Sequence, residues 1–261
     1  MNPRFRRTRG YILGGLLFAI LLILFVVRGD IFLKDMLSHQ DVLPVRSVEI
    51  DGALQQLTKK QIADITGRIC AGQNIASLDL SVLQKTLEQE PWIAQVVISK
   101  KMPDTLVISI VEHVPAAFWN ENGFYDAKTA SVFYPKGGNY QANLVHLGAE
   151  RENLAPEVYA AAVQFIRMME GKRAYQMYSL YLDKVHSYTL TLNNKIKTRL
   201  ILGQFKDARA RLDRFLKAFE QTGLNINQVP YVDLRYDVGF AVGKIENSRE
   251  DNNESIPKKL R

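Results

Sequence analysis

Cysteine is almost absent from the sequence: Cys70 is the only one, so no disulfide can form within the chain. It stands in the turn after an amphipathic stretch, Ile62 to Ile69, where a free cysteine is most often a small buried apolar residue. The fold must therefore be held by packing alone. At 261 residues, 47% of them hydrophobic, the chain is long enough for a membrane span and one or two small domains with modest cores.

The motifs of common catalytic and metal sites are also absent. The four histidines lie at least thirty positions apart, and none has a cysteine or carboxylate at a metal-ligand spacing. The segment from Gly239 to Ile245 resembles a phosphate-binding loop, but it is one residue short between its glycines and has Ile245 in place of the hydroxyl. Scattered acidic residues show no spacing that marks a catalytic pair. An enzyme is therefore the weaker class of hypothesis, and we expect no cofactor and no metal.

Acidic residues are missing from the first 29 positions, which contain five arginines. These five account for most of the net charge of +7 and leave +2 for the remaining residues. A nucleic-acid-binding surface would need a basic face that carries most of the charge. The sequence thus argues against nucleic acid as a partner and assigns the basic excess to the N-terminus.

Charge is absent altogether from Tyr11 to Val27. Seventeen helical residues extend about 25 Å, somewhat less than a hydrocarbon core of about 30 Å, and the flanking Arg9 and Arg28 can reach the interfaces. Bulky or charged residues follow where a signal peptide would have a small-x-small cleavage site, so the segment is typical of an uncleaved anchor. A buried core helix is the other alternative, but such helices rarely begin a chain behind four arginines.

The arginines also predict the orientation. Four of them precede the span, and the positive-inside rule keeps that end in the cytoplasm. We expect a cytoplasmic tail at 1–10, a transmembrane helix at 11–27, a linker at 28–44 and the remaining residues outside the membrane, in a single-pass type II arrangement. No later segment is long and apolar enough to return the chain across a membrane.

Residues 45–113 are predicted to form a compact unit with the order β-α-α-β-β. A strand at 45–52 precedes a helix that begins at Thr58 and a second helix capped by Asp79 or Ser81. Alternating apolar residues then predict two strands in hairpin order, with a turn at 102–104. This order resembles a POTRA module. Such modules dock partner proteins at exposed sheet edges, where backbone donors and acceptors are unpaired.

Residues 114–245 are predicted to form a β-rich domain with two helices, at 156–170 and 206–222, and residues 246–261 a polar, disordered tail. The whole chain is thus expected to be of the α+β class. The second helix has its apolar positions on one face, and the basic residues around the rest are expected to be solvated. These basic residues are Arg209, Arg211, Arg214 and Lys217. Alternation from 231 to 243 predicts one last strand.

Several segments, taken together and in this order, resemble the FtsQ/DivIB family of cell-division proteins. They are PWI at 91–93, PDTL at 103–106, VEHVP at 111–115, LTLNN at 190–194 and YVDLRYD at 231–237. The resemblance implies an essential bitopic scaffold of the divisome, located in the cell inner membrane at the septum and without catalytic activity. It also implies that the scaffold links early to late division proteins.

The same resemblance implies partners and binding residues. The β domain of the family binds FtsB within the FtsB and FtsL complex, largely by strand addition to the last strand, and FtsK, FtsW and FtsI are further partners. The residues carried over for FtsB binding are Arg235, Tyr236, Val238, Gly239, Lys244 and His186. Gln95 and Lys100 match positions associated with recruitment. Relatives can carry an arginine at the position of His186 and an aromatic residue at that of Lys244, which leaves these two side-chain contacts open.

Three alternatives from the residues alone stay open. Tyr236 alternates in phase with Val232, Leu234 and Val238, so period two favours a packing role over a partner contact. A glycine within a strand, here Gly239, indicates a bulge or a close backbone approach. A docking subunit of an outer-membrane assembly machine would be expected to have tandem POTRA repeats, and no second β-α-α-β-β pattern follows in the sequence.

Overall fold

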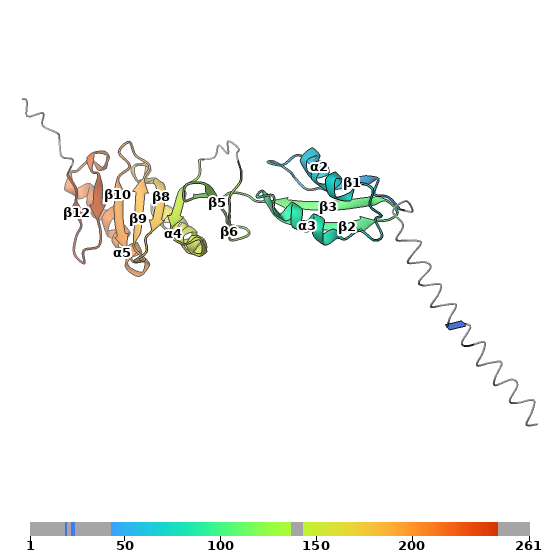
Figure 1. Cartoon of the computed structure of the whole chain (residues 1–261). Coiled ribbons are helices and arrows are strands. Elements are labelled where there is room, and N and C mark those ends of the chain that lie inside the picture. The colour runs from blue at the N-terminus through green and yellow to red at the C-terminus, as the bar shows by residue number, and fades with distance from the viewer. Residues whose placement is uncertain (1–18, 20–21, 24–42, 137–142, 245–261) are drawn as a thin grey trace, which may run out of the picture. The chain divides into compact units, whose positions relative to one another are not determined.

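The computed structural model describes residues 43–136 and 143–244, together with Ala19, Leu22 and Ile23, which are helical. The chain divides into two units between His113 and Val114 (Figure 1). The predicted transmembrane helix and the C-terminal tail lie outside the described residues, apart from those three positions. Within the described part, no helix has both the length and the apolar character that a membrane crossing needs.

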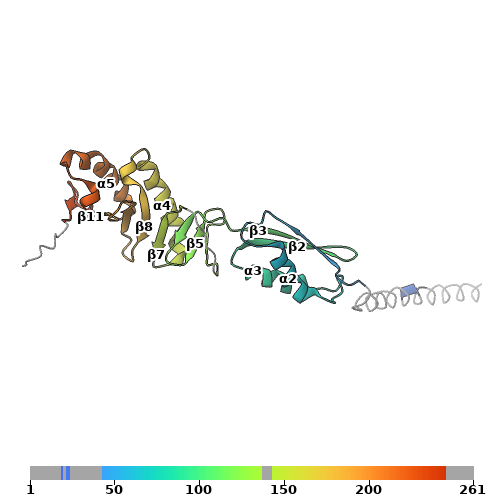
Figure 2. The same cartoon turned by 90° about the horizontal axis from the view of Figure 1, so that it is seen from above.

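The first unit has the predicted β-α-α-β-β order. Its described elements are β1 (Ser47–Asp51), α2 (Lys59–Cys70), α3 (Leu80–Glu88), β2 (Ile93–Lys101) and β3 (Thr105–Glu112). The three strands pair in the order β1-β3-β2, with β1 parallel and β2 antiparallel to the central β3. Both helices lie on one face of this sheet (Figure 2). The unit is therefore an α+β module in which β1 and β2 form the edges.

The helix starts follow the predicted caps. The Thr58 side chain accepts a hydrogen bond from the Gln61 N–H, and the Gln61 side chain accepts one from the Thr58 N–H, which completes a capping box. Asp79 caps α3 by accepting from the Ser81 N–H. At the end of α2, Cys70 is 2% exposed, and burial raises the pKa of its thiol. The prediction of a buried, apolar cysteine is confirmed.

Glu112, in the VEHVP segment at 111–115, has a structural role in the first unit. Its carboxylate accepts hydrogen bonds from three successive backbone N–H groups, those of Gln55, Gln56 and Leu57, at 2.7 to 3.3 Å. These groups precede the first helix, so Glu112 ties the end of β3 to the β1–α2 connection. The predicted turn between β2 and β3 is also present at 102–104.

The second unit is built on one mixed sheet. Its described strands pair in the order β12-β11-β10-β9-β8-β7-β4-β5-β6. Their bounds are β4 (Ala117–Trp119), β5 (Gly123–Asp126), β6 (Ser131–Phe133), β7 (His146–Ala149), β8 (Met177–Leu182), β9 (Tyr188–Leu192), β10 (Arg199–Gly203), β11 (Tyr231–Asp233) and β12 (Ala241–Val242). Short 3-10 helices lie at Glu152–Leu154, Arg173–Tyr175, Phe219–Thr222 and Ile226–Gln228.

The two predicted helices of this unit are present as α4 (Ala155–Met168) and α5 (Phe205–Ala218). Each connects a pair of parallel strands, α4 between β7 and β8 and α5 between β10 and β11. Figure 2 shows both helices on the same face of the sheet. The apolar positions predicted for α5 are all buried: Leu212, Phe215, Leu216 and Phe219. Their burial on the sheet fixes the helix beside the C-terminal strands.

The prediction of one strand from 231 to 243 is wrong. The chain forms β11, leaves the sheet after Asp233, and returns as the two-residue β12, which pairs antiparallel with β11. Gly239 has a φ of 83°, a left-handed conformation that glycine adopts without steric cost. Phe240 then packs against the rings of Phe215 on α5 and of Phe219, the first residue of the 3-10 helix that follows α5. The alternating sequence therefore spans a hairpin and not one extended strand.

Candidate partner-binding edge

β12 is the last described strand at one side of the nine-stranded sheet. Val242 lies opposite Val232, and the N–H of the next residue, Gly243, donates to the Tyr231 carbonyl at 2.9 Å. In an antiparallel pair, hydrogen-bonded and non-hydrogen-bonded positions alternate. The N–H and C=O of Val242 therefore point away from β11, toward the open edge. Such an edge can pair with a strand from another chain.

The connection from Leu234 to Phe240, here called the 234–240 loop, begins with a tight ion pair. The Arg235 guanidinium donates through Nε to Asp233 Oδ1 at 2.9 Å and through Nη2 to Asp233 Oδ2 at 2.7 Å. The Arg235 N–H donates to the same carboxylate at 3.0 Å. These hydrogen bonds lower the pKa of Asp233 and raise that of Arg235. The ion pair gives Arg235 a defined orientation in the free chain.

Two arginines of α5 hold the backbone of the same loop. Arg214 donates through Nη1 to the Asp237 carbonyl at 2.6 Å and through Nη2 to the Tyr236 carbonyl at 2.8 Å. Arg211 donates to the Leu202 carbonyl at 3.0 Å and to the Arg235 carbonyl at 3.2 Å. The expectation that both are merely solvated is therefore wrong, whereas Arg209 and Lys217 are exposed as predicted.

The short edge strand depends on these side-chain contacts. Ordering the backbone of one residue costs about 1–2 kcal/mol. One backbone hydrogen bond contributes only about 1 kcal/mol net, so the ladder of a two-residue strand cannot order the loop by itself. Leu234, which is 1% exposed, and Phe240 add apolar packing at the two ends of the loop. The arginine contacts then hold the residues between them.

The exposed side chains of the loop correct a second interpretation. Period two placed Tyr236 and Val238 on the core face, but they are 54% and 94% exposed. Only Val232 and Leu234 of that set are buried. The alternation fails because the strand ends at Asp233, so the later positions no longer follow the pleat of the sheet. The loop thus presents an aromatic and an aliphatic side chain to solvent.

His186 lies at the same end of the sheet as Arg235. It is exposed, with a φ of 56°, in the turn between β8 and β9. The turn is organised by the Asp183 carboxylate, which accepts from the N–H groups of Val185 and Ser187. Asp183 also contributes to the raised pKa of Arg235, so the turn and the loop are electrostatically coupled. Lys244 lies past the other end of β12, where the preceding Gly243 faces Tyr231.

Gln95 and Lys100 belong to the first unit and lie on its edge strand β2. Gln95 is exposed and paired in register with Val111 of β3. The Lys100 ammonium donates to the Ala76 carbonyl at 3.0 Å, in the connection between α2 and α3. The structure therefore places these two residues in the first unit, whereas the residues carried over for FtsB binding all lie in the second.

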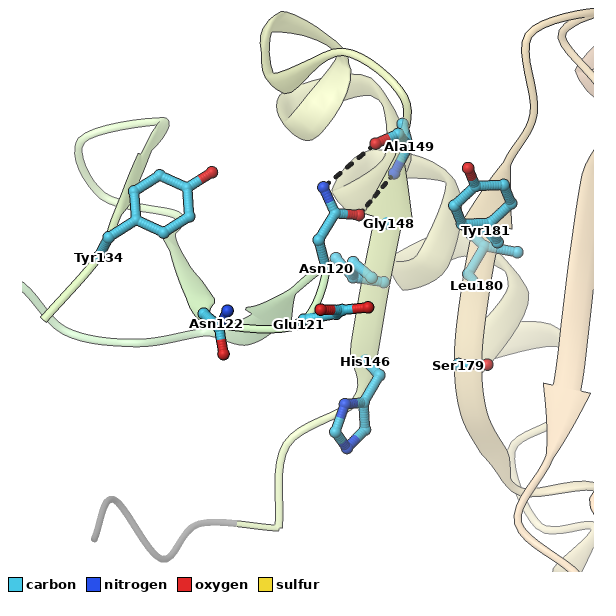
Figure 3. A pocket seen from close by; sticks show the side chains of 11 residues that line it. Asn120, Glu121, Asn122, Tyr134, His146, Gly148, Ala149, Ser179, Leu180 and Tyr181 are labelled. Atoms are coloured by element: carbon cyan, nitrogen blue, oxygen red, sulfur yellow. Dashed lines mark hydrogen bonds between the residues drawn. The ribbon is translucent and has the colours of Figure 1, made fainter. Parts of the chain in front are cut away.

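Two hollows in the second unit offer an alternative kind of site. The first, of about 650 Å³, is lined by Asn120, Tyr134 and Tyr181 among others (Figure 3). The Asn120 amide is bonded both ways to the backbone of Ala149, at 3.2 Å in each direction. The Tyr134 hydroxyl donates to Glu152, and burial together with this bond raises the pKa of Tyr134 to about 12. These polar groups are engaged in holding the fold.

The second hollow, of about 750 Å³, contains His146 and Tyr178. The His146 ring stacks on Phe118 at 4.6 Å and lies 4.8 Å from the Tyr178 ring, over which the Lys197 ammonium sits at 3.4 Å. Burial, with the nearby Lys197 charge, lowers the pKa of His146. Within residues 43–136 and 143–244, no group of three or more histidine, cysteine or acidic residues is placed to hold a metal.

The fold defines a class: a two-unit protein with a POTRA-like α+β module followed by a β-rich domain. Residues 43–113 match the POTRA domain, FtsQ-type, and residues 117–235 match the family described as Cell division protein FtsQ/DivIB, C-terminal. This chain belongs to the FtsQ/DivIB family. The matched region ends at Arg235, so most of the 234–240 loop lies beyond it.

Individual relatives agree with this assignment. The chain is 30% identical over 201 residues to "Cell division protein FtsQ" of Vibrio cholerae, covering 77% of this chain and 75% of the relative. It is 29% identical over 243 residues to the Escherichia coli protein of the same name, covering 91% and 86%. The Aliivibrio fischeri protein is 30% identical over 226 residues, covering 82% and 83%. The recognition of the family from its sequence segments is confirmed.

Sequence reasoning missed the roles of three residues that shape this edge, namely Asp233, Arg211 and Arg214. Asp233 and Arg235 are two positions apart, a spacing that places side chains on the same side of an extended chain, so their pairing could have been expected. Arg211 and Arg214 are three apart on α5 and border its buried face. Nothing in the sequence indicates that their partners are backbone carbonyls, because those carbonyls depend on where the hairpin turns.

Proposed function

We propose that this chain is a membrane-anchored scaffold of the cell-division machinery that binds FtsB, within a complex of FtsB and FtsL, by accepting a strand at β12. The observation that carries the proposal is the outward-facing N–H and C=O of Val242 beside exposed side chains of the 234–240 loop. Main-chain pairing supplies affinity in strand addition, and side chains next to the strand supply specificity.

Arg235 supports recognition of an acidic side chain on the partner. The Asp233 carboxylate accepts from Nε and from one Nη2 hydrogen of Arg235, so Nη1 and the second Nη2 hydrogen of Arg235 are left for another acceptor. A second carboxylate would then join the pair without displacing Asp233. Tyr236 and Val238 add the exposed aromatic and aliphatic contacts that interfaces use as anchors.

The N-terminal sequence supports the proposed topology, and membership of the cell-division family supports the proposed location at the septum. We place the chain in the cell inner membrane at the septum, with the span at Tyr11 to Val27, the N-terminus in the cytoplasm and both units outside. A reporter that works only outside the cytoplasm, fused after Arg261, should be active. An inactive outside reporter together with an active cytoplasmic one would overturn the orientation.

Recruitment is assigned to the first unit. Gln95 on the edge strand β2 and Lys100 are the contacts proposed for FtsK, and FtsW and FtsI are further partners of the assembled scaffold. Gln95→Ala should reduce septal localisation of the chain while leaving FtsB binding unchanged. Normal localisation of this variant would remove Gln95 from the proposal.

The direct test of the edge compares two substitutions at one position. Val242→Pro removes the outward N–H, and Val242→Ala trims the side chain but keeps that donor. In a binding titration of the full chain with FtsB, the proline variant should lose affinity by at least about tenfold, and the alanine variant by less than about threefold. Thermal melting confirms that each variant is folded. Equal affinities for parent and Val242→Pro would place the docking edge elsewhere.

A further inference from the structure

We propose that Arg211 and Arg214 of α5 are positioning residues for β12: they hold the 234–240 loop so that the edge is formed before a partner arrives. The inference rests on the proposed function, because it concerns the same edge. It goes beyond that function because it gives two residues of α5 an indirect role in binding: their hydrogen bonds hold the 234–240 loop and are not made to the partner.

The contacts of the two arginines form a clamp on three successive carbonyls. Arg211 binds the carbonyl of Arg235, and Arg214 binds those of Tyr236 and Asp237. Hydrogen bonds from a guanidinium are charge-assisted and stronger than those between neutral groups, and the planar fork fixes direction as well as distance. The backbone of the loop is thereby held against α5, while the Tyr236 and Val238 side chains are exposed.

Gly203 at the end of β10 gives a second, independent sign that the site is built for this contact. A Cβ at this position would lie 2.6 Å from Arg211 Nη1 and 3.3 Å from Arg235 Cγ. Its φ of 77° also favours glycine. The absence of a side chain at Gly203 therefore makes the space in which the Arg211 guanidinium reaches the Leu202 and Arg235 carbonyls.

The consequence for binding follows from the length of β12. The strand has two residues, and the clamped carbonyls lie four to six positions before its first residue, Ala241. Without the clamp, only the contacts of the Phe240 ring with Phe215 and Phe219 would hold the segment that leads into β12. The fraction of molecules with a formed edge then falls, and the apparent affinity for a strand falls by the same factor.

The test uses Arg214, because its hydrogen bonds go only to the loop, whereas Arg211 also supports β10. The full chain, purified in detergent, is mixed with the extracytoplasmic part of FtsB, and association and dissociation are followed separately. Arg214→Ala should lower the apparent association rate constant about tenfold, with less than about a twofold change in dissociation, as expected when a pre-formed state is depopulated.

The matched control is Arg209→Ala, which removes the same charge from an exposed position of the same helix and should change neither rate. Arg214→Lys keeps the charge but loses the two-pronged geometry, and should fall between the parent and Arg214→Ala. In the free chain, Arg214→Ala should also speed amide exchange at Gly243, whose N–H is bonded to Tyr231. This last readout needs no partner.

Each outcome decides between the two claims. If the parent binds and Arg214→Ala associates at the parental rate, the clamp has no positioning role and the proposed function stands. If the loss appears in dissociation instead, Arg214 contacts the partner directly and the inference is overturned. A parent and an Arg209→Ala variant that both fail to bind overturn the proposed function, and the inference fails with it.

Discussion

At the scale of single residues, the candidate edge is shaped by charges that pair within the chain. Arg235 was nominated as a partner contact by resemblance, and in the free chain Asp233 holds its guanidinium in a two-point contact. The Asp233 side chain is 13% exposed and that of Arg235 is 56% exposed. The pair therefore contributes little to stability, on the order of 0.2–1 kcal/mol. Its value lies in orienting the guanidinium.

The pKa of Asp233 gives a residue-scale prediction. Hydrogen bonds from Arg235 hold this pKa below its ordinary value of 3.8, so the ion pair stabilises the fold above that pH and is lost as pH falls through the lowered pKa. Arg235→Ala should raise the pKa of Asp233 toward 3.8, as measured by a pH titration of its carboxyl resonance. Asp79, whose pKa is lowered by the Ser81 N–H in the other unit, is the internal control. An unchanged Asp233 titration would contradict the pairing.

At the scale of elements, local patterns predicted the helices and the three strands of the first unit well. Thr58, Asp79 and the apolar faces are local signals, and each is present in the structure where the pattern placed it. The last strand failed for a non-local reason. Its alternation is real, but the ring contacts of Phe240 and the arginines of α5 stabilise a hairpin, and neither contact can be read from the segment itself.

Substitutions at two glycines distinguish the effect of backbone conformation on stability from the effect of packing. Neither Gly67, within α2, nor Gly239 has any heavy atom within 4 Å of an added Cβ, but only Gly239 has a positive φ. Gly67→Ala should raise the free energy of unfolding by about 0.5–1 kcal/mol, because alanine is the better helix former.

Gly239→Ala should instead lower the stability of the hairpin by about 1–2 kcal/mol, the cost of a left-handed alanine. Denaturant unfolding measures the first effect, and amide exchange in β11 and β12 measures the second. A neutral or stabilising Gly239→Ala would show that the loop adopts another conformation.

At the scale of the whole molecule, the family, the POTRA-type unit and the β-rich second unit follow from the sequence. The residues proposed for FtsB binding lie at three places around the β12 edge. Arg235, Tyr236, Val238 and Gly239 share one loop, His186 lies at the same end of the sheet, and Lys244 lies past the other end of β12. Sequence could nominate this set by resemblance. It could not show that α5 organises it, because that depends on contacts between residues more than twenty positions apart.

The most direct measurement of the central claim is amide hydrogen exchange, residue by residue, in the full chain with and without FtsB. Val242 and Lys244 alternate with Gly243, so their N–H groups are predicted to face the open edge, and their exchange should slow by more than about tenfold on binding. Gly243, already bonded to Tyr231, should change much less. Unchanged exchange at Val242 and Lys244, with protection appearing at β6 or β2 instead, would contradict strand addition at β12.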